Sequence, residues 1–268
     1  MRHFRSKGFH ISWALAVLSA GAAVFYIEKH YQPPPILDIP ASGHELTRGK
    51  IATDTQARGP LPQNGQPTVP TVSSYTFPKT YLLKIPFSSQ APTANWDQLH
   101  NEACEETSAI MAAQYLNGNT SATLPADLVE SELAKITDWE KQTFGYYLDI
   151  NSEETAQLLM EFYGLKAQVL HNLTLDEIKT ELSQNRVILW PANGQKLGNP
   201  NFRQPGPPYH MLVIKGWDSK GIITNDPGTR KGQNYFYTYE TLYNANGDWS
   251  HNLNAVDEGN KTAIIVWK

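Results

Sequence analysis

An apolar run near the start of the chain differs from everything that follows it. It spans residues 9–27, is almost free of charge and has no polar face, and Arg2, Arg5 and Lys7 precede it. About 20 apolar residues suffice for a helix to cross a bilayer, and flanking basic residues stay in the cytoplasm. We therefore predict that residues 1–8 are a cytoplasmic basic end and residues 9–27 a transmembrane signal anchor.

A cleaved signal peptide is the alternative interpretation of this run. Ala20-Gly21-Ala22 would supply the small residues of a cleavage site, although the apolar run continues beyond them to Ile27. Both interpretations place the rest of the chain outside the cytoplasm. The protein would be a single-pass protein of the cell membrane with an extracytoplasmic domain, or a secreted protein if the leader is cleaved.

Residues 28–79 show no sustained apolar period. Nine of the chain's 18 prolines lie between Pro33 and Pro78, among glycine, threonine, glutamine and serine. This composition is typical of a flexible, partly polyproline linker. The remaining residues 80–268 have the length of a single domain.

Within residues 80–268, helical patterns come first and strand patterns come later. Helices are predicted from Cys104 to a C-cap at Gly118, from Thr123-Leu124-Pro125 with Pro at the first helical position, over Ser152–Tyr163 and from a capping box at Thr174–Glu177. Strands are predicted over Tyr81–Phe87, Arg186–Trp190, Tyr209–Gly216, Gly221–Thr224 and Thr262–Trp267. This order indicates an α+β fold in which an antiparallel sheet packs on helices.

Composition narrows the classes of function. The 22 basic and 26 acidic side chains give a net charge of −4, which argues against a nucleic-acid partner. The single cysteine excludes an internal disulfide, a zinc ribbon and an iron–sulfur site, and we expect no metal and no cofactor. Cys104 is then a buried thiol, half of an intermolecular bridge, or a nucleophile.

Cys104 lies at the predicted start of a helix. The free N–H groups and the dipole of a helix N-terminus favour the reactive thiolate over the thiol. Glu105 and Glu106 would raise the pKa of the thiol, but acidic residues in a first turn are ordinary partners of the helix dipole. The alternative is a small buried side chain without a chemical role.

A thiolate nucleophile needs a base, and His210 is well placed for that role. It begins an apolar strand after the turn Gly206–Tyr209, and the next strand ends at Asp226. If the two strands are antiparallel neighbours, Asp226 can orient the imidazole. Gln90 would donate to a developing oxyanion beside the backbone N–H of Cys104. Singly, each has a commoner role, as a strand-end histidine, a turn former or a loop glutamine, but their combination favours catalysis.

The segments around these four residues resemble a known family. They are Ile85–Gln90, Cys104–Ala109, Tyr209–Val213 and Asn225–Thr229. They are similar to papain-like cysteine peptidases of family thirty-nine, specifically its stand-alone "like" branch, which is related to bacteriocin-leader processing enzymes. The resemblance covers residues 80–268 and departs from the commonest motif, in which Gly-Pro stands in place of Glu105-Glu106.

The resemblance implies a papain-like fold with the nucleophile helix packed on an antiparallel sheet. It assigns Cys104 as nucleophile, His210 as general base and acid, Asp226 as the orienting carboxylate and Gln90 as oxyanion donor. The implied activity is hydrolysis of peptide bonds in a peptide or protein substrate through a Cys104 thioester, by a membrane-anchored extracytoplasmic enzyme. The stretch Pro191–Tyr209, rich in Gly, Asn and Pro, would form one wall of the cleft.

Three other functions remain open for the same residues. A cell-wall peptide amidase or transpeptidase would use the same scaffold. A catalytically inactive extracytoplasmic binding module would keep the fold without turnover. A zinc site of Cys104, His210 and Asp226 would need a further ligand and has no closely spaced ligand pair on one element.

Overall fold

The computed structural model describes residues 76–268. The predicted cytoplasmic end, the anchor or signal peptide, and nearly all of the linker lie outside these residues. Within the described residues, no helix has the length and apolar character that crossing a bilayer requires.

This part of the chain contains both helices and strands, as the sequence predicts. The helices are α2 (Gln98–Glu102), α3 (Cys104–Leu116), α4 (Ala126–Thr143), α5 (Ser152–Glu161), α6 (Leu175–Ser183), α7 (Gly194–Leu197) and α8 (Tyr239–Ala245). The strands are β1 (Tyr81–Leu82), β2 (Lys166–His171), β3 (Val187–Ala192), β4 (His210–Trp217), β5 (Gly221–Asn225), β6 (Tyr235–Thr238), β7 (Asp248–Ser250), β8 (Ala255–Asp257) and β9 (Thr262–Trp267).

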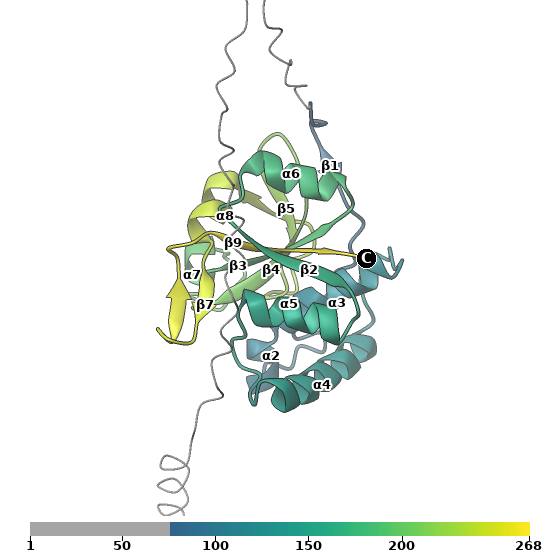
Figure 1. Cartoon of the computed structure of the whole chain (residues 1–268), viewed down its shortest axis with the longest axis vertical. Coiled ribbons are helices and arrows are strands. Elements are labelled where there is room, and N and C mark those ends of the chain that lie inside the picture. The colour runs from purple at the N-terminus through teal and green to yellow at the C-terminus, as the bar shows by residue number, and fades with distance from the viewer. Residues whose placement is uncertain (1–75) are drawn as a thin grey trace, which may run out of the picture. The chain divides into compact units, whose positions relative to one another are not determined.

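Seven of these strands form one antiparallel sheet. Its order is β2-β9-β3-β4-β5-β6, and β1 pairs with β4. The strands β7 and β8 form a separate hairpin. Figure 1 shows α3, α4 and α5 grouped on one side of the sheet and α6 and α8 on the other. The predicted α+β class with an antiparallel sheet packed on helices is confirmed.

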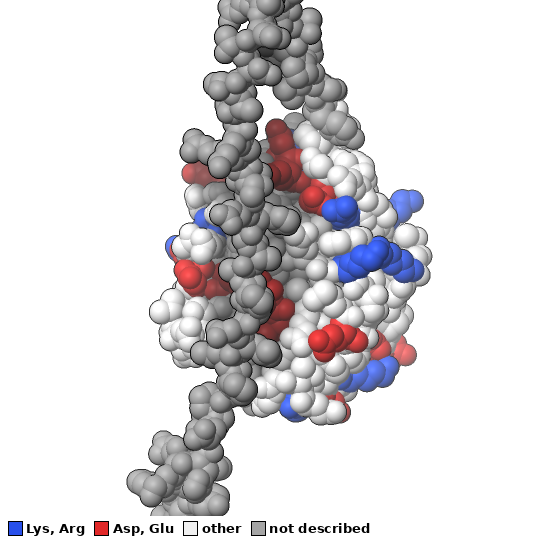
Figure 2. Space-filling view, viewed as in Figure 1, with Lys and Arg blue, Asp and Glu red and all other residues white. Residues whose placement is uncertain are grey.

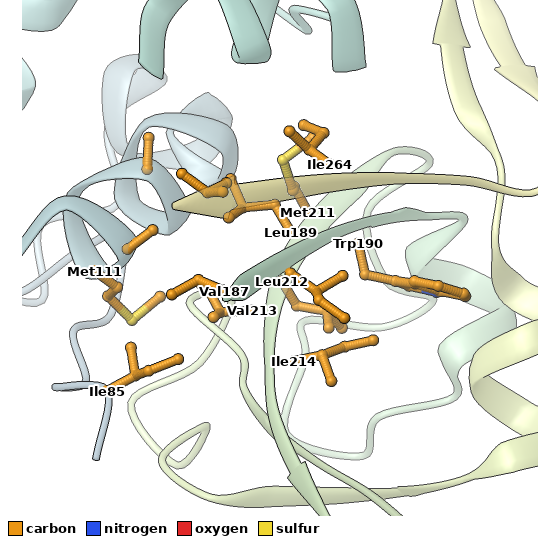
Figure 3. Packing of buried hydrophobic residues seen from close by; sticks show 14 of the residues in the cluster. Ile85, Met111, Val187, Leu189, Trp190, Met211, Leu212, Val213, Ile214 and Ile264 are labelled. Atoms are coloured by element: carbon orange, nitrogen blue, oxygen red, sulfur yellow. The ribbon is translucent and has the colours of Figure 1, made fainter. Parts of the chain in front are cut away.

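The central strands β3 and β4 are buried at every position because helices cover both faces of the sheet. On one face, Leu189 and Val213 are direct cross-strand partners, and Met111 of α3 packs beside them (Figure 3). On the other face, the indole of Trp190 donates a hydrogen bond to the Leu242 carbonyl of α8. This two-sided core holds the start of α3 and the start of β4 in fixed relative positions.

Several local patterns gave the right elements. The helix that begins at Cys104 is confirmed, and Gly118 follows it in the left-handed conformation, with φ of +94°. The capping box at Thr174 is also formed, since its side chain accepts from the Glu177 N–H and the Glu177 carboxylate accepts from the Thr174 N–H. Both signals act within one helical turn, so they do not depend on the rest of the fold.

The predicted strand Tyr81–Phe87 is much shorter in the structure. Only Tyr81 and Leu82 pair with β4, and the Leu83 N–H makes one more bond to the Lys215 carbonyl. Pro86 has no N–H for a ladder, so the chain leaves the sheet at this point. Phe87 instead bridges to Thr123. The consequence is that the loop carrying Gln90 bends away toward α2 and α3.

Candidate active site

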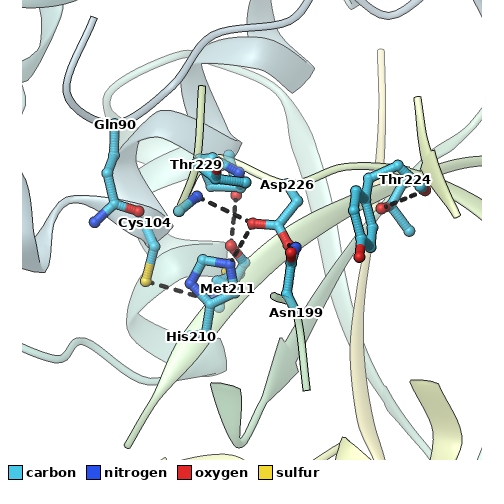
Figure 4. A network of polar contacts seen from close by, with 12 residues as sticks. Gln90, Cys104, Asn199, His210, Met211, Thr224, Asp226 and Thr229 are labelled. Atoms are coloured by element: carbon cyan, nitrogen blue, oxygen red, sulfur yellow. Dashed lines mark hydrogen bonds and ion pairs between the residues drawn. The ribbon is translucent and has the colours of Figure 1, made fainter. Parts of the chain in front are cut away.

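Cys104 is the first residue of α3 and is only 5% exposed. Its thiol donates to Glu105 Oε2 at 2.9 Å, and the Met211 N–H donates to its Sγ at 3.3 Å. Met211 follows His210 in β4, so the second contact places the thiol directly beside the start of that strand (Figure 4). The side-by-side placement of α3 and β4 therefore brings together residues that are more than 100 positions apart.

The protonation of Cys104 differs from the expectation. Burial raises the pKa of the thiol well above its ordinary value, and the Glu105 carboxyl raises it further. The helix N-terminus does not outweigh these two effects. Glu105 and Glu106 are correspondingly not solvated partners of the helix dipole, because each is only 1% exposed. Cys104 is a hydrogen-bonded thiol at rest.

His210 and Asp226 form a buried pair across β4 and β5. His210 Nε2 lies 2.8 Å from Asp226 Oδ1, and the two side chains are almost fully buried. With Nε2–H donating to the carboxylate, Nδ1 carries the lone pair. Figure 4 shows the imidazole between the Cys104 thiol and the Asp226 carboxylate. The expected neighbourhood of His210 and Asp226 is thus present.

The Asp226 carboxylate accepts hydrogen bonds from four donors. Oδ1 also accepts from the Gly228 N–H at 3.0 Å, while Oδ2 accepts from the Tyr237 hydroxyl at 2.6 Å and from Asn199 Nδ2 at 3.1 Å. Burial by itself would raise the pKa of Asp226, but His210 and these hydrogen bonds lower it below its ordinary value. Asp226 is therefore held as an anion rather than serving as a plain turn former.

Gln90 lines the same cleft but its amide is engaged elsewhere. Nε2 donates to the carbonyl of His100 at 2.8 Å and to that of Asn101 at 3.1 Å, while the buried Oε1 has no partner. The backbone N–H of Gln90 bonds to the Pro227 carbonyl, which ties this loop to the residue after Asp226. The role of oxyanion donor stays a prediction, and it requires one amide hydrogen to change partner.

Three buried glutamates lie close to Cys104 in the sequence or pack against its helix: two are in the first turn of α3 and one is in α4. Glu105, Glu106 and Glu140 are each at most 1% exposed, and each has at least one carboxyl oxygen without a partner. Burial raises the pKa of all three. The neighbouring carboxyls raise the pKa of Glu105 and Glu140 further, whereas the hydrogen bond to Glu140 lowers that of Glu106. The sequence held one signal for Glu140, since it continues the apolar stripe of Val129 and Leu133 in α4.

An open cleft of about 1130 Å³ exposes the edge of this site. Cys104 and His210 both line it, together with Gln90, Trp96 and Asn101. Residues 200–207 and Tyr209 also line it, within the stretch predicted as a wall. Residues 228–231, which follow Asp226, contribute to the lining as well. The cleft has room for several residues of an extended peptide.

The sequence profile of the Peptidase_C39 like family matches residues 82–252. The chain belongs to the Peptidase_C39 like family. Membership in this family indicates a peptidase that acts on a peptide substrate, and the mixed helix and antiparallel-sheet architecture is that of a C39-like peptidase. The matched region contains all four residues singled out from the sequence: Gln90, Cys104, His210 and Asp226.

A crystal structure of a Bacillus anthracis protein described as a C39-like peptidase is similar to this family member. The two share 18% sequence identity at a TM-score of 0.47, over 71% of this chain and 98% of the other. No curated protein matches the chain.

Two residues of the site carried no usable sequence signal. Asn199 and Tyr237 complete the hydrogen-bond shell of Asp226, and their own side chains bond to each other at 2.9 Å. They come from the segment after α7 and from β6, so only the folded chain brings them together. Among residues 76–268, no group of three His, Cys, Asp or Glu side chains is arranged to hold a metal ion.

Proposed function

We propose that this C39-like protein is a cysteine-type peptidase with Cys104 as nucleophile, His210 as general base and acid, and Asp226 as the orienting carboxylate. The observation that carries the proposal is the buried pair of His210 and Asp226, 2.8 Å apart, whose histidine lines the same cleft as Cys104. A histidine whose far nitrogen is held by a carboxylate has the tautomer and orientation that a base requires.

The raised pKa of Cys104 favours general-base attack over a stored ion pair. The thiol hydrogen first turns from Glu105 Oε2 toward His210 Nδ1. It passes to Nδ1 as Sγ bonds to the carbonyl carbon of the substrate, and Asp226 stabilises the resulting imidazolium. The tetrahedral oxyanion forms at the start of α3, near the Cys104 N–H and Gln90. His210 then protonates the departing amine, and water releases the acyl group from the Cys104 thioester.

The decisive experiment compares the full-length wild type with Cys104→Ala and His210→Ala on a mixed peptide library, with cleavage products identified by mass spectrometry. Both variants should lose turnover by about 10³-fold or more while keeping the wild-type circular dichroism spectrum. His171→Ala is a matched control, because His171 is an exposed histidine at the end of β2. Cleavage by Cys104→Ala at the wild-type rate would refute the mechanism.

Cross-linked cell-wall stem peptides form a second arm of the same experiment. Faster cleavage of these peptides than of unstructured polypeptides would identify the protein as a cell-wall amidase or transpeptidase and not as a general peptidase. The catalytic assignments would be unaffected, because the bond that breaks is an amide in both classes.

We also propose that residues 9–27 anchor the enzyme in the cell membrane with residues 80–268 outside the cytoplasm. The basic residues before the apolar run support this orientation. Protease added to intact cells should remove the domain. The proposal would be contradicted if the added protease cleaved the enzyme only after lysis and the enzyme was found in neither the membrane fraction nor the culture medium.

A further inference from the structure

The lining of the cleft is basic although the chain as a whole is acidic. Arg203, Arg230 and Lys231 line it, and no aspartate or glutamate does. The chain carries a net charge of −4, and acidic and basic side chains are interspersed over the face shown in Figure 2. The cleft therefore differs in charge from the molecule that contains it.

These three cations are also free of partners inside the domain. All three side chains are exposed, and none has an ion pair or a side-chain hydrogen bond within residues 76–268. Elsewhere in the same residues, Arg186 pairs with Glu181 and Lys196 pairs with Glu258. Three unpaired cations in one concave site favour an anionic ligand over an internal structural role.

The two loops that carry the cations both contact His210. The ring of Phe202, the residue before Arg203, meets the imidazole edge-on at 5.2 Å between centroids. A Cβ added to Gly228, two residues before Arg230, would lie 2.8 Å from His210 Cε1. The cations therefore come from the two loops that flank His210.

In the proposed mechanism, these two loops contact one definite half of the substrate. His210 protonates the departing amine, so the leaving half of the peptide lies against the loops that flank His210. We propose that Arg203, Arg230 and Lys231 form a carboxylate subsite for this half. The substrates are then peptides with an acidic side chain, or a free C-terminal carboxylate, in the first positions after the scissile bond. The inference rests on the proposed peptidase function.

A binding experiment tests the subsite without requiring turnover. Full-length Cys104→Ala is titrated into two pools of labelled hexapeptide amides, and binding is followed by fluorescence anisotropy. The pools differ only at one fixed position, which is Glu in one pool and Gln in the other. Exposed ion pairs contribute factors of about 1.4 to 5 each, so three of them should make the Glu pool bind about tenfold more tightly. Replacing Arg203, Arg230 and Lys231 together by Ala should abolish the difference. Lys220→Ala should preserve it, because Lys220 is an exposed lysine outside the cleft.

Turnover by the wild type then locates the subsite and identifies the source of the carboxylate. Peptides with an identical acyl half carry leaving halves of Glu-Gly amide, Gln-Gly amide, Gly-Gly amide or Gly-Gly free acid. Higher kcat/KM for the first indicates an acidic side chain, and for the last a C-terminal carboxylate. Equal binding of the two pools, together with equal kcat/KM for the Gly-Gly amide and the Gly-Gly free acid, would overturn the subsite. An acidic preference before the scissile bond would overturn its placement. Carboxylate binding without any Cys104-dependent cleavage would support the subsite and count against the peptidase function alone.

Discussion

Replacing Asp226 by Asn would exchange one carboxylate oxygen for an NH₂ group and so disturb two hydrogen bonds, while the volume of the side chain stays almost the same. Asn has one oxygen and one NH₂ where Asp226 has two acceptors, so two of its four donors must face a donor. If the NH₂ lies at the Oδ1 position, the Gly228 N–H loses its acceptor and His210 Nε2 must become an acceptor. The proton of His210 then moves to Nδ1, which is the nitrogen that must accept the thiol proton.

The other orientation of the Asn amide also costs stability. The NH₂ would then face the Tyr237 hydroxyl, which can rotate, and the amide of Asn199, which cannot turn freely. The reason is that Asn199 Oδ1 already accepts from the backbone and side chain of Asn201, each at 3.0 Å. An orphaned buried donor costs about 1–3 kcal/mol, and the remaining bonds lose their charge assistance, so we expect about 2–5 kcal/mol of destabilisation. The correct histidine tautomer is lost only in the first orientation, which should lower kcat/KM by about 10²–10⁴.

Tyr237→Phe separates the two effects. It removes the 2.6 Å bond to Oδ2 but leaves the contact between Asp226 and His210 in place. It should cost about 1–3 kcal/mol of stability while kcat/KM stays within about fivefold of wild type. Urea unfolding gives the stabilities, and a peptide identified by library digestion gives kcat/KM. We expect the first orientation, and a folded Asp226→Asn enzyme with more than a tenth of wild-type kcat/KM would contradict both that orientation and the loss of the tautomer.

Wild type and Asp226→Asn also allow a test of how stability depends on pH. The pKa of Asp226 in the folded state is below its ordinary value of 3.8, so its anion stabilises the fold above about pH 4. This contribution is lost as pH falls through the folded pKa. The stability difference between the wild type and Asp226→Asn should therefore be constant near neutrality and narrow in stronger acid.

Three further substitutions probe the surroundings of the site. Glu105→Gln removes an acidic neighbour that raises the pKa of Cys104, so iodoacetamide should alkylate the thiol about tenfold faster at neutral pH; an unchanged rate contradicts the role of Glu105. Burial and neighbouring carboxyls raise the pKa of Glu140, so the folded state holds a proton that the unfolded state has released. Glu140 should therefore contribute a fall of about 1.4 kcal/mol per pH unit above its ordinary value of 4.5, in addition to the contributions of Glu105 and Glu106. Glu140→Gln should reduce the slope by about this amount, as urea unfolding at a series of pH values will show. Gly228→Ala places a methyl group against the imidazole of His210 and should reduce kcat by about tenfold or more while the melting temperature changes little. A large fall in the melting temperature together with the loss of kcat would indicate general unfolding.

Sequence alone determined the elements whose signals are local. The start of α3 at Cys104, the capping box at Thr174 and the apolar strand after His210 each depend on neighbours within a turn or a strand. The edge strand β2 was missed because its exposed and half-buried positions alternate without a strong apolar face. The hairpin of β7 and β8 was missed because its strands are short and none of their residues is buried.

For the site, order along the chain was enough to nominate Cys104, His210 and Asp226, because each stands at the end of an element. Their ionisation was decided only by the tertiary structure. Burial of Cys104 against Glu105 raises the pKa that a helix start alone would lower, while donors from distant segments keep Asp226 an anion. The physical reason is that desolvation and hydrogen-bond partners depend on what packs around a group, and those neighbours come from segments far apart in the sequence.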